Sequence, residues 1–587
     1  MSLRSTLISS VALVWSGLAL AANPSPAQMG LDHGMTPPLL DFYIPGTGWE
    51  PVVTTINLTS FGAKCDGNTD DTTAIKNWLS SQGTSANNFT LTAPAGVCVF
   101  SSPLSMPFAT NYTVLGNGPK TTTFKYIGLD YNGTVTAGAS WSAAATSINL
   151  TSAILPAHIT AALNGSGQPL YPMSAWDVQS GAIKFIGRVA SIIGATLTIQ
   201  TPGAVFASAG SSDTVHLTTD LLTISDTAHG GEAGAAWRDF GIVSSTVLSG
   251  GYAFHFHGMF DTDLQTLWAD DVNSLDATTR GNLCGGFWFD GVGGVSRFAD
   301  PSAYSLQNCG DGILVNTALG GTAELLLFGG NIGGKSANNV VTGFTAGVHM
   351  AGGIGGIRCD SSNIHTNIIG WEVDQTVVAT ANREFDIGST CALDSNQNQG
   401  LRVNDSGTGG PIDLAGWIGS TQQGPGVDIE AVSANTSIQL RGETIYDNCG
   451  DGVYNNSSNA NYYISPGLSF RYNGHNLGSG CAAWQAAAGS GTGYGLNAAT
   501  APASAKGQPK FQQNVAGKIN GTWIGLTLDE GVGYSAAGTA LPTCNSAEKG
   551  YSATVIDANG PSYNATYSSG GSVTAKVICD GTNWVTQ

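Results

Sequence analysis

The chain has 587 residues, with 40 acidic and 21 basic side chains and a formal net charge of −19. This charge disfavours partners such as nucleic acid or anionic membranes. Charged residues make up only 10% of the chain, whereas 81 residues are glycine. Such a composition disfavours exposed amphipathic helices and favours short strands joined by tight turns.

The amino-terminal residues predict export. Arg4 precedes an uncharged apolar run from Leu7 to Leu20, and the small-residue pattern Ala19-Leu20-Ala21 follows. This is the pattern of a secretory signal peptide, here residues 1–21. No later stretch reaches the ~18 consecutive apolar residues of a membrane span. We therefore expect a secreted protein, extracellular or periplasmic, with an amino-terminal extension over 22–54.

Ten cysteines in an exported chain are compatible with five disulfides. Taken in order they form pairs separated by 25 to 35 residues, although buried free thiols remain an alternative. Metal ligation is not expected, because no CxxC or Cys/His cluster occurs. The pairs are Cys65 with Cys98, Cys284 with Cys309, Cys359 with Cys391, Cys449 with Cys481, and Cys544 with Cys579.

A short phrase, glycine followed by apolar-x-apolar, returns every 23 to 35 residues through the middle of the chain. Alternation with period two marks each phrase as a strand with one buried face. Repetition at this spacing predicts parallel strands stacked coil upon coil, which is a right-handed parallel β-helix. The phrases begin at Gly251, Gly286, Gly312, Gly347, Gly370, Gly400, Gly426 and Gly452.

Residues 61–75 read FGAKCDGNTDDTTAI, which closely resembles the opening motif of the pectate-lyase-like superfamily of right-handed β-helices. The superfamily contains rhamnogalacturonases, polygalacturonases, lyases, epimerases and phage tailspikes. The resemblance therefore implies a fold and a polysaccharide partner without naming a reaction. Within the motif, Asp70 or Asp71 is expected to cap a helix whose apolar side chains Ile75, Trp78 and Leu79 close the end of the solenoid.

The chain divides around this solenoid. The β-helix is expected over 55–481, with a small β-module inserted at about 135–202. An Ala/Gly/Ser-rich stretch predicts a linker or cap over 482–540. A small carboxy-terminal β-module is expected over 541–587. The oligomeric state stays open between monomer and trimer.

Because alternate side chains of a strand face opposite ways, the middle position of each phrase defines an outward column. From Trp288 onward, this column and its neighbour form a strip of acids and aromatic residues suited to binding a sugar chain. The expected substrate-binding residues are Trp288, Asp290, His349, Arg402 and Tyr454.

Glycoside hydrolysis needs a proton donor and a second carboxylate. Glu372 and Asp428 lie two coils apart, about 9.6 Å at ~4.8 Å per coil, and Asp374 and Glu430 repeat the relation on the neighbouring column. We therefore predict a secreted glycoside hydrolase that uses these four carboxylates. Asp311 and Asp451 also precede strand glycines, but some five coils apart, so the pattern of a standard polygalacturonase is missing.

Two alternatives stay open. One is a polysaccharide lyase, in which calcium held by acids around Arg402 would neutralise a uronate; otherwise no cofactor is expected. The other is a noncatalytic glycan-binding surface protein of the tailspike or adhesin kind, in which Arg402 only satisfies the acids above and below it.

Overall fold

The computed structural model describes three strands before residue 54 and most of the chain after it. The predicted signal peptide, residues 1–21, and Cys481 lie outside the described residues. The larger gaps after residue 28 are 33–38, 82–88, 225–231, 271–277, 317–322, 475–492, 527–540 and 545–551.

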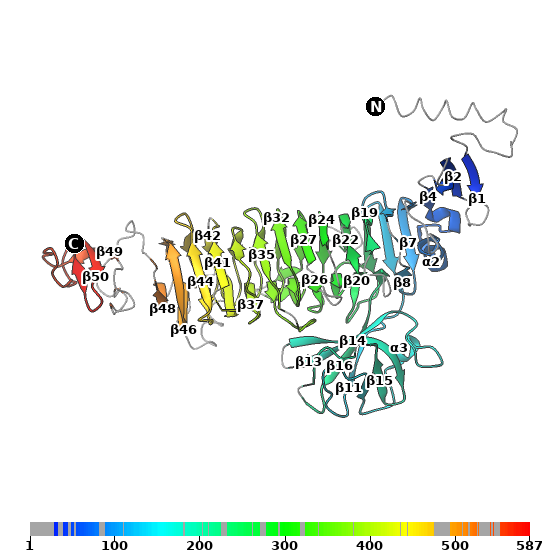
Figure 1. Cartoon of the computed structure of the whole chain (residues 1–587), viewed down its shortest axis with the longest axis horizontal. Coiled ribbons are helices and arrows are strands. Elements are labelled where there is room, and N and C mark those ends of the chain that lie inside the picture. The colour runs from blue at the N-terminus through cyan, green and yellow to red at the C-terminus, as the bar shows by residue number, and fades with distance from the viewer. Residues whose placement is uncertain are drawn as a thin grey trace, which may run out of the picture.

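The fold is a long parallel β-helix with a small β-module on one side and another at the carboxy end (Figure 1). Three stacks of parallel strands run along it. We call the stack that carries the candidate site the site-bearing stack. Its strands are β8 (Leu104–Met106), β17 (Leu222–Ile224), β20 (Tyr252–His257), β23 (Gly285–Asp290), β26 (Asp311–Asn316), β31 (Ala346–Met350), β34 (Ile369–Val373), β37 (Gln399–Asn404), β40 (Val427–Ala431), β43 (Val453–Asn455), β46 (Tyr494–Gly507) and β48 (Gly517–Ile524).

The other two stacks complete each coil and share the long strands β19 (Ala236–Ser244) and β22 (Asp263–Ala269). The second stack contains β4 (Thr54–Asn57), β6 (Phe89–Thr92), β9 (Thr113–Leu115), β24 (Gly294–Ala299), β27 (Ala323–Phe328), β32 (Gly356–Asp360), β35 (Glu384–Ile387), β38 (Ile412–Leu414), β41 (Thr436–Leu440) and β44 (Ala460–Ile464). The third contains β5 (Asp66–Asp70), β7 (Gly96–Phe100), β10 (Thr122–Tyr126), β25 (Ser302–Tyr304), β28 (Asn331–Gly333), β33 (Asn363–His365), β36 (Ala392–Asp394), β39 (Trp417–Gly419), β42 (Thr444–Tyr446), β45 (Ser469–Arg471) and β47 (Lys510–Gln512).

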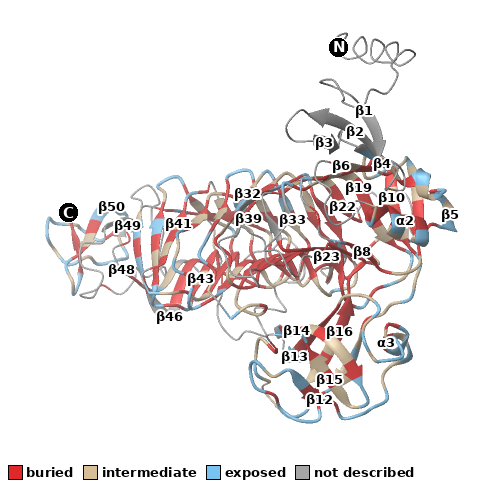
Figure 2. Cartoon of the chain, turned by 45° about the vertical axis from the view of Figure 1, so that its right-hand side comes forward, coloured by how far each residue is buried: buried red, intermediate tan, exposed pale blue. Residues whose placement is uncertain are grey.

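Inward side chains stack in register and form the core. Phe254 lies against Phe287 with ring centroids 5.0 Å apart, and Phe256 lies against Phe289 at 5.2 Å. Figure 2 shows this buried interior along the solenoid and into the junction with the inserted module. Aligned rings in successive coils bury large apolar areas in each repeat, which is the main stabilising term of such a fold.

The amino end is closed by α2 (Thr72–Leu79), which follows the 3-10 turn η1 (Leu58–Phe61). Ile75, Trp78 and Leu79 are buried as predicted. The capping differs in detail. Asp71 is the N-cap residue, but its carboxylate accepts from the backbone N–H groups of Lys64 and Cys65 instead, at 2.7 and 2.9 Å. Asp70 accepts from the Thr72 N–H at 3.0 Å.

The inserted module is an antiparallel sheet over residues 133–219, longer than the predicted 135–202. It contains β11 (Gly133–Thr136), β12 (Ser147–Asn149), α3 (Ala157–Ala161), β13 (Met173–Gln179), β14 (Ala182–Ile193), β15 (Thr196–Ile199) and β16 (Thr214–Thr219). β16 pairs with both β11 and β13 and is therefore part of this sheet. The predicted boundaries had placed β16 in the solenoid.

The solenoid also continues past the predicted boundary at Cys481. Residues 494–524, expected to be part of a linker, form β46, β47 and β48. Leu496, Ala498, Ala503 and Ala505 are buried, so small side chains fill the inward positions that larger residues fill in earlier coils. A composition typical of a linker therefore concealed a strand pattern.

The ends carry small sheets: β1 (Met29–Asp32), β2 (Leu39–Ile44) and β3 (Gly48–Pro51) before the solenoid, and β49 (Ser552–Ala558), β50 (Val573–Cys579) and β51 (Trp584–Thr586) after it. Two short pairs lie in loops: β18 (Glu232–Ala233) with β21 (Met259–Phe260), and β29 (Lys335–Ala337) with β30 (Val340–Thr342). In the described part of the chain, no helix is both long enough and apolar enough to cross a bilayer.

Four disulfides join the predicted pairs: Cys65–Cys98, Cys284–Cys309, Cys359–Cys391 and Cys544–Cys579. Cys449 is also disulfide-bonded. Several bonds of this kind are typical of proteins that fold outside the cytoplasm.

Candidate active site

The outward column predicted from the glycine phrases exists in the strand register. His349 of β31 pairs with Glu372 of β34, which pairs with Arg402 of β37. Arg402 pairs with Asp428 of β40, which pairs with Tyr454 of β43. Five residues that lie far apart in the sequence thus follow one another along one face of the solenoid.

The two earliest expected binding residues, Trp288 and Asp290 on β23, lie under the inserted module. Trp288 is 0% exposed and contacts Trp176 and Phe185 of the module, with ring centroids at 5.3 and 5.6 Å. Its ring therefore has no free face for a sugar, and the expectation for Trp288 is corrected. The physical reason is that an outward-facing side chain is exposed only where nothing packs on the sheet.

Asp290 takes part in a polar network in the same contact. Its carboxylate accepts from Arg188 of the module at 3.2 Å and from Asn316 at 2.8 Å, and it lies 3.0 Å from Nδ1 of His257. Burial acts to raise the pKa of Asp290, but His257, His255 and Arg188 hold it well below its usual value. Asp290 is therefore a buried, satisfied anion of the module interface and not a substrate contact.

A cavity of about 620 Å³ lies between the inserted module and the site-bearing stack. Its lining includes His349, Glu372, Asp374 and Arg402 from the solenoid, and module residues opposite them. We call it the cleft. Its volume is in the range of small-molecule and sugar sites. Two of the four predicted catalytic carboxylates, Glu372 and Asp374, line it, whereas Asp428 and Glu430 lie on coils beyond it.

His349 is held between two carboxylates. Its Nδ1 lies 3.0 Å from Oδ2 of Asp311, and its Nε2 lies 3.0 Å from Oδ1 of Asp374. Burial acts to lower the pKa of His349, but Asp374 and Asp311 outweigh it and raise that pKa well above its usual value. The imidazole is therefore a cation that fixes both acids.

The pKa values of Glu372 and Asp374 are shifted in opposite directions, although the two residues lie close together at the end of β34. Burial raises the pKa of Glu372 to about 7. Burial also acts to raise the pKa of Asp374, but the charge of His349 and hydrogen bonds from His349 and Thr376 lower it overall. One carboxyl is thus protonated at a pH where the other is ionised. Opposed shifts of this kind separate an acid from a base.

Arg402 links Glu372 to the next coils. It donates to Oε1 of Glu372 at 2.8 Å and makes a two-point contact with Glu430 at 3.0 Å. Asp428 is buried between these coils, and burial followed by the charge of Glu430 raises its pKa to about 7. One of its oxygens, Oδ1, has no hydrogen-bond partner. Tyr454 is partly exposed next to it in the column.

Three further residues belong to this group. Asp311 binds His349, and the Tyr252 hydroxyl donates to Asp311 at 3.2 Å. Thr376 donates its N–H and its hydroxyl to Asp374 at 2.9 and 2.7 Å. In the sequence, Asp311 stands out because it precedes the strand glycine Gly312. There it was compared with Asp451, which holds the same position in a later coil, and its contact with His349 was missed. Asp451 has a structural role, because it accepts from Gly493, Tyr494 and Asn497.

His349, Glu372 and Asp374 each offer one ligand atom, and these atoms lie within 4.8 Å of one another. A calcium ion prefers six to eight oxygen ligands. This set contains an imidazole whose two nitrogens are each hydrogen-bonded to a carboxylate, so it fits calcium poorly. This group therefore does not support the alternative of a calcium-assisted lyase.

The sequence was compared with protein families and with curated proteins. Residues 55–234 match the family described as rhamnogalacturonase A/epimerase, pectate lyase-like. No curated protein matches the whole chain or a part of it.

Among solved structures, the chain is similar to the A-module of the mannuronan C-5 epimerase AlgE4 of Azotobacter vinelandii, at 12% identity and a TM-score of 0.45, over 81% of this chain and 99% of that one. It is similar to the tailspike gp49 of Pseudomonas phage LKA1, at 13% identity and 0.31, over 91% and 98%. It is also similar to the Streptococcus pneumoniae surface protein and adhesin PfbA, at 8% identity and 0.29, over 81% and 99%.

By their names, these three proteins are an epimerase module, a phage tailspike and an adhesin. The family match covers the capping helix, the first coils and the inserted module. Residues 55–234 are thus similar to this family, and the stacked parallel strands make the fold a parallel β-helix.

Proposed function

We propose that the protein is a secreted glycoside hydrolase whose reaction takes place in the cleft between the inserted module and the site-bearing stack. The observation that carries the proposal is the pair formed by Glu372 and Asp374. The two carboxyls open into one cleft, and their pKa values are shifted in opposite directions.

In this proposal Glu372 is the acid. Its proton passes to the glycosidic oxygen as the bond from that oxygen to the anomeric carbon breaks. Asp374, held ionised by His349 and Thr376, attacks the anomeric carbon and forms an ester. Water then cleaves the ester, and its proton returns to Glu372. Asp311 and His349 act as positioning residues for Asp374.

The short distance supports a retaining outcome. Oxygens of Glu372 and Asp374 belong to a group whose ligand atoms lie within 4.8 Å of one another. Retaining glycosidases hold their carboxyls about 5 Å apart, whereas inverting enzymes leave about 6.5–9.5 Å for a water. The pairing of Glu372 with Asp428 expected from the sequence would be of the wider kind, and Asp428 does not line the cleft.

The charge of the site favours a neutral glycan over a polyuronate. Next to the carboxyl pair, Asp311, Asp374 and Glu430 surround two cations, His349 and Arg402, and both are already paired with acids. Lys184 of the module also lines the cleft, with its ammonium over the Phe206 ring. A uronate would therefore meet more acids than cations beside the carboxyl pair. Hydrolysis is therefore favoured over β-elimination.

A panel of polysaccharides tests the proposal. We expect new reducing ends from a polymer of neutral sugars, with no rise in ultraviolet absorbance from unsaturated products. Activity should fall as the pH rises through about 7, because Glu372 loses its proton there. Unsaturated products would replace the hydrolase with a lyase. Binding without cleavage at every pH would favour the glycan-binding surface protein.

A further inference from the structure

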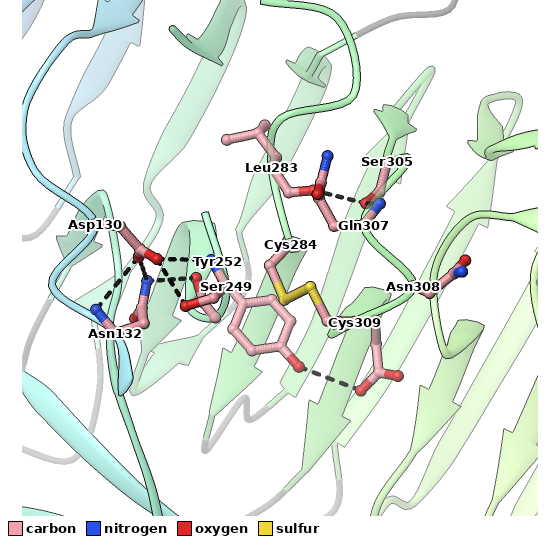
Figure 3. The surroundings of a disulfide bond; sticks show 12 residues. Asp130, Asn132, Ser249, Tyr252, Leu283, Cys284, Ser305, Gln307, Asn308 and Cys309 are labelled. Carbon is pink, nitrogen blue, oxygen red and sulfur yellow. Dashed lines mark hydrogen bonds between the residues drawn. A yellow bond between two sulfur atoms is a disulfide. The ribbon is translucent and has the colours of Figure 1, made fainter. Parts of the chain in front are cut away.

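Asp130 and Asn132, on the segment that enters the inserted module, lie beside Ser249 and Tyr252 (Figure 3). Thr218, on the last strand of the module, and Gly250 and Gly251 line the same end of the cleft. Asn132 donates to the carbonyl of Gly250 at 2.9 Å and accepts from the Thr219 N–H at 2.8 Å. Ser249 donates through its N–H and hydroxyl to Asp130, at 3.1 and 2.7 Å. The entering segment, the leaving segment and the loop before β20 are therefore joined.

This end is also tightly packed. A Cβ on Gly250 would lie 2.8 Å from Cγ2 of Thr218, and a Cβ on Gly251 would lie 2.3 Å from the Thr219 carbonyl oxygen. Gly251 has φ of +74°, which other residues adopt rarely. The end of β16 therefore lies directly against Gly250 and Gly251, which line this end of the cleft.

Toward the amino end of the cleft, the inserted module also packs on the outward column. Trp176 and Phe185 of the module form an apolar cluster with Trp288, Leu314 and Val377 of the solenoid. The backbone N–H of Phe185 donates to the Thr376 carbonyl at 2.8 Å, so β14 is bonded directly to the loop that follows β34. The module therefore covers the outward column at β23 and β26.

The opposite end of the cleft is open. Val178 and Ile183, on the hairpin formed by β13 and β14, are 39% and 40% exposed and line the cleft. Asn404 lines it from β37 and is exposed. Past this point the column continues over Asp428 and Tyr454. Figure 1 shows the module beside the amino half of the solenoid, away from β41 and β44.

We propose that the inserted module makes the site blind-ended, so that it accepts the terminal sugars of a glycan and releases short products from one chain end. The inference rests on the proposed hydrolase function and defines its substrate as a chain terminus. The uncleaved part of the chain lies toward Arg402 and Tyr454, and the released unit lies near Asp311 and Tyr252.

The test uses the full protein and the polysaccharide that it cleaves in the panel. Product length is followed by mass spectrometry, and the molar mass of the remaining polymer by size-exclusion chromatography with light scattering. We expect short products of one length from the first time point, while the polymer shows no early loss of molar mass. An early loss of molar mass with mixed product lengths would overturn the inference and leave the hydrolase proposal intact.

End-blocked oligosaccharides of the same sugar give an independent readout. One substrate carries a bulky fluorescent label at the reducing end, and the other carries a blocking group at the non-reducing end. We expect one of the two blocks to abolish cleavage and the other to leave the rate unchanged. Equal cleavage of both would overturn the blind-ended site. If no polysaccharide releases reducing ends, the proposed function fails and the inference fails with it.

Discussion

The same outward column has two different chemistries in two regions of the solenoid. At β23 and β26 it presents Trp288 and Leu314, and the inserted module packs on both. At β34, β37 and β40 it presents Glu372, Arg402 and Asp428. An apolar residue in an outward position thus marks where another part of the chain covers the solenoid, and the change to charged residues marks where the site begins.

The largest effects are expected from the carboxyl pair. Replacing Glu372 by Gln removes the proton donor with little change in shape, and we expect turnover of the cleaved polysaccharide to fall about 10²- to 10⁴-fold. Asp374→Asn should lose as much. Asp428→Asn is the matched control, because it changes an equally buried acid outside the cleft. Loss in the control with full activity in Asp374→Asn would restore the wider Glu372–Asp428 pairing.

Next in size is the contact that covers the solenoid. Trp288→Ala empties a fully buried site between the module and the sheet, and we expect a loss of about 3–5 kcal/mol in unfolding free energy. Chemical denaturation with separate probes of module and solenoid measures it. Trp417→Ala, at a partly exposed ring on another stack, is the comparison and should cost far less. Equal losses would mean that Trp288 is not part of a close-packed interface.

A smaller, pH-dependent effect is expected at Asp428. Its folded pKa of about 7 lies above the usual 3.8, so ionisation opposes folding as the pH rises through that interval. Asp428→Asn removes this cost, and we expect the variant to gain about 2 kcal/mol in stability relative to the native protein between pH 5 and pH 8. Thermal unfolding at both values measures the gain. A constant difference between the two proteins would mean that Asp428 titrates normally.

The smallest effect is expected at Thr376. Its hydroxyl favours the ionised form of Asp374, so Thr376→Val should raise the pKa of that carboxyl. We expect the acid limb of the pH–rate profile to move upward by about one unit, with the alkaline limb unchanged. Thr390→Val, outside the cleft, is the control. A uniform fall in rate without a shift of the acid limb would indicate a structural role only.

Much of this arrangement could be predicted from the sequence, because a β-helix turns a linear repeat into a spatial column. The phrases at Gly347, Gly370, Gly400 and Gly426 were enough to align His349 with Glu372, Arg402 and Asp428. The cysteine pairs followed from the same spacing of about one coil.

The rest could not be predicted because it depends on where the inserted module docks. That module buries Trp288 and Asp290 and supplies one wall of the cleft. The pairing of Asp311 with His349 crosses between coils at the edge of the strands, where the glycine phrases give no register. The Ala-rich strand β46 was not predicted, because its inward side chains are too small to give a visible hydrophobic alternation.

The disulfides give the solenoid a further property. Cys284–Cys309 and Cys359–Cys391 each join residues about one coil apart, on both sides of the coil that carries His349. If a protease cuts a surface loop between two bonded cysteines, the two fragments stay covalently attached and their strands stay in hydrogen-bonded register. We therefore expect the fold to survive such a cut, and the fragments to separate on a gel only after reduction.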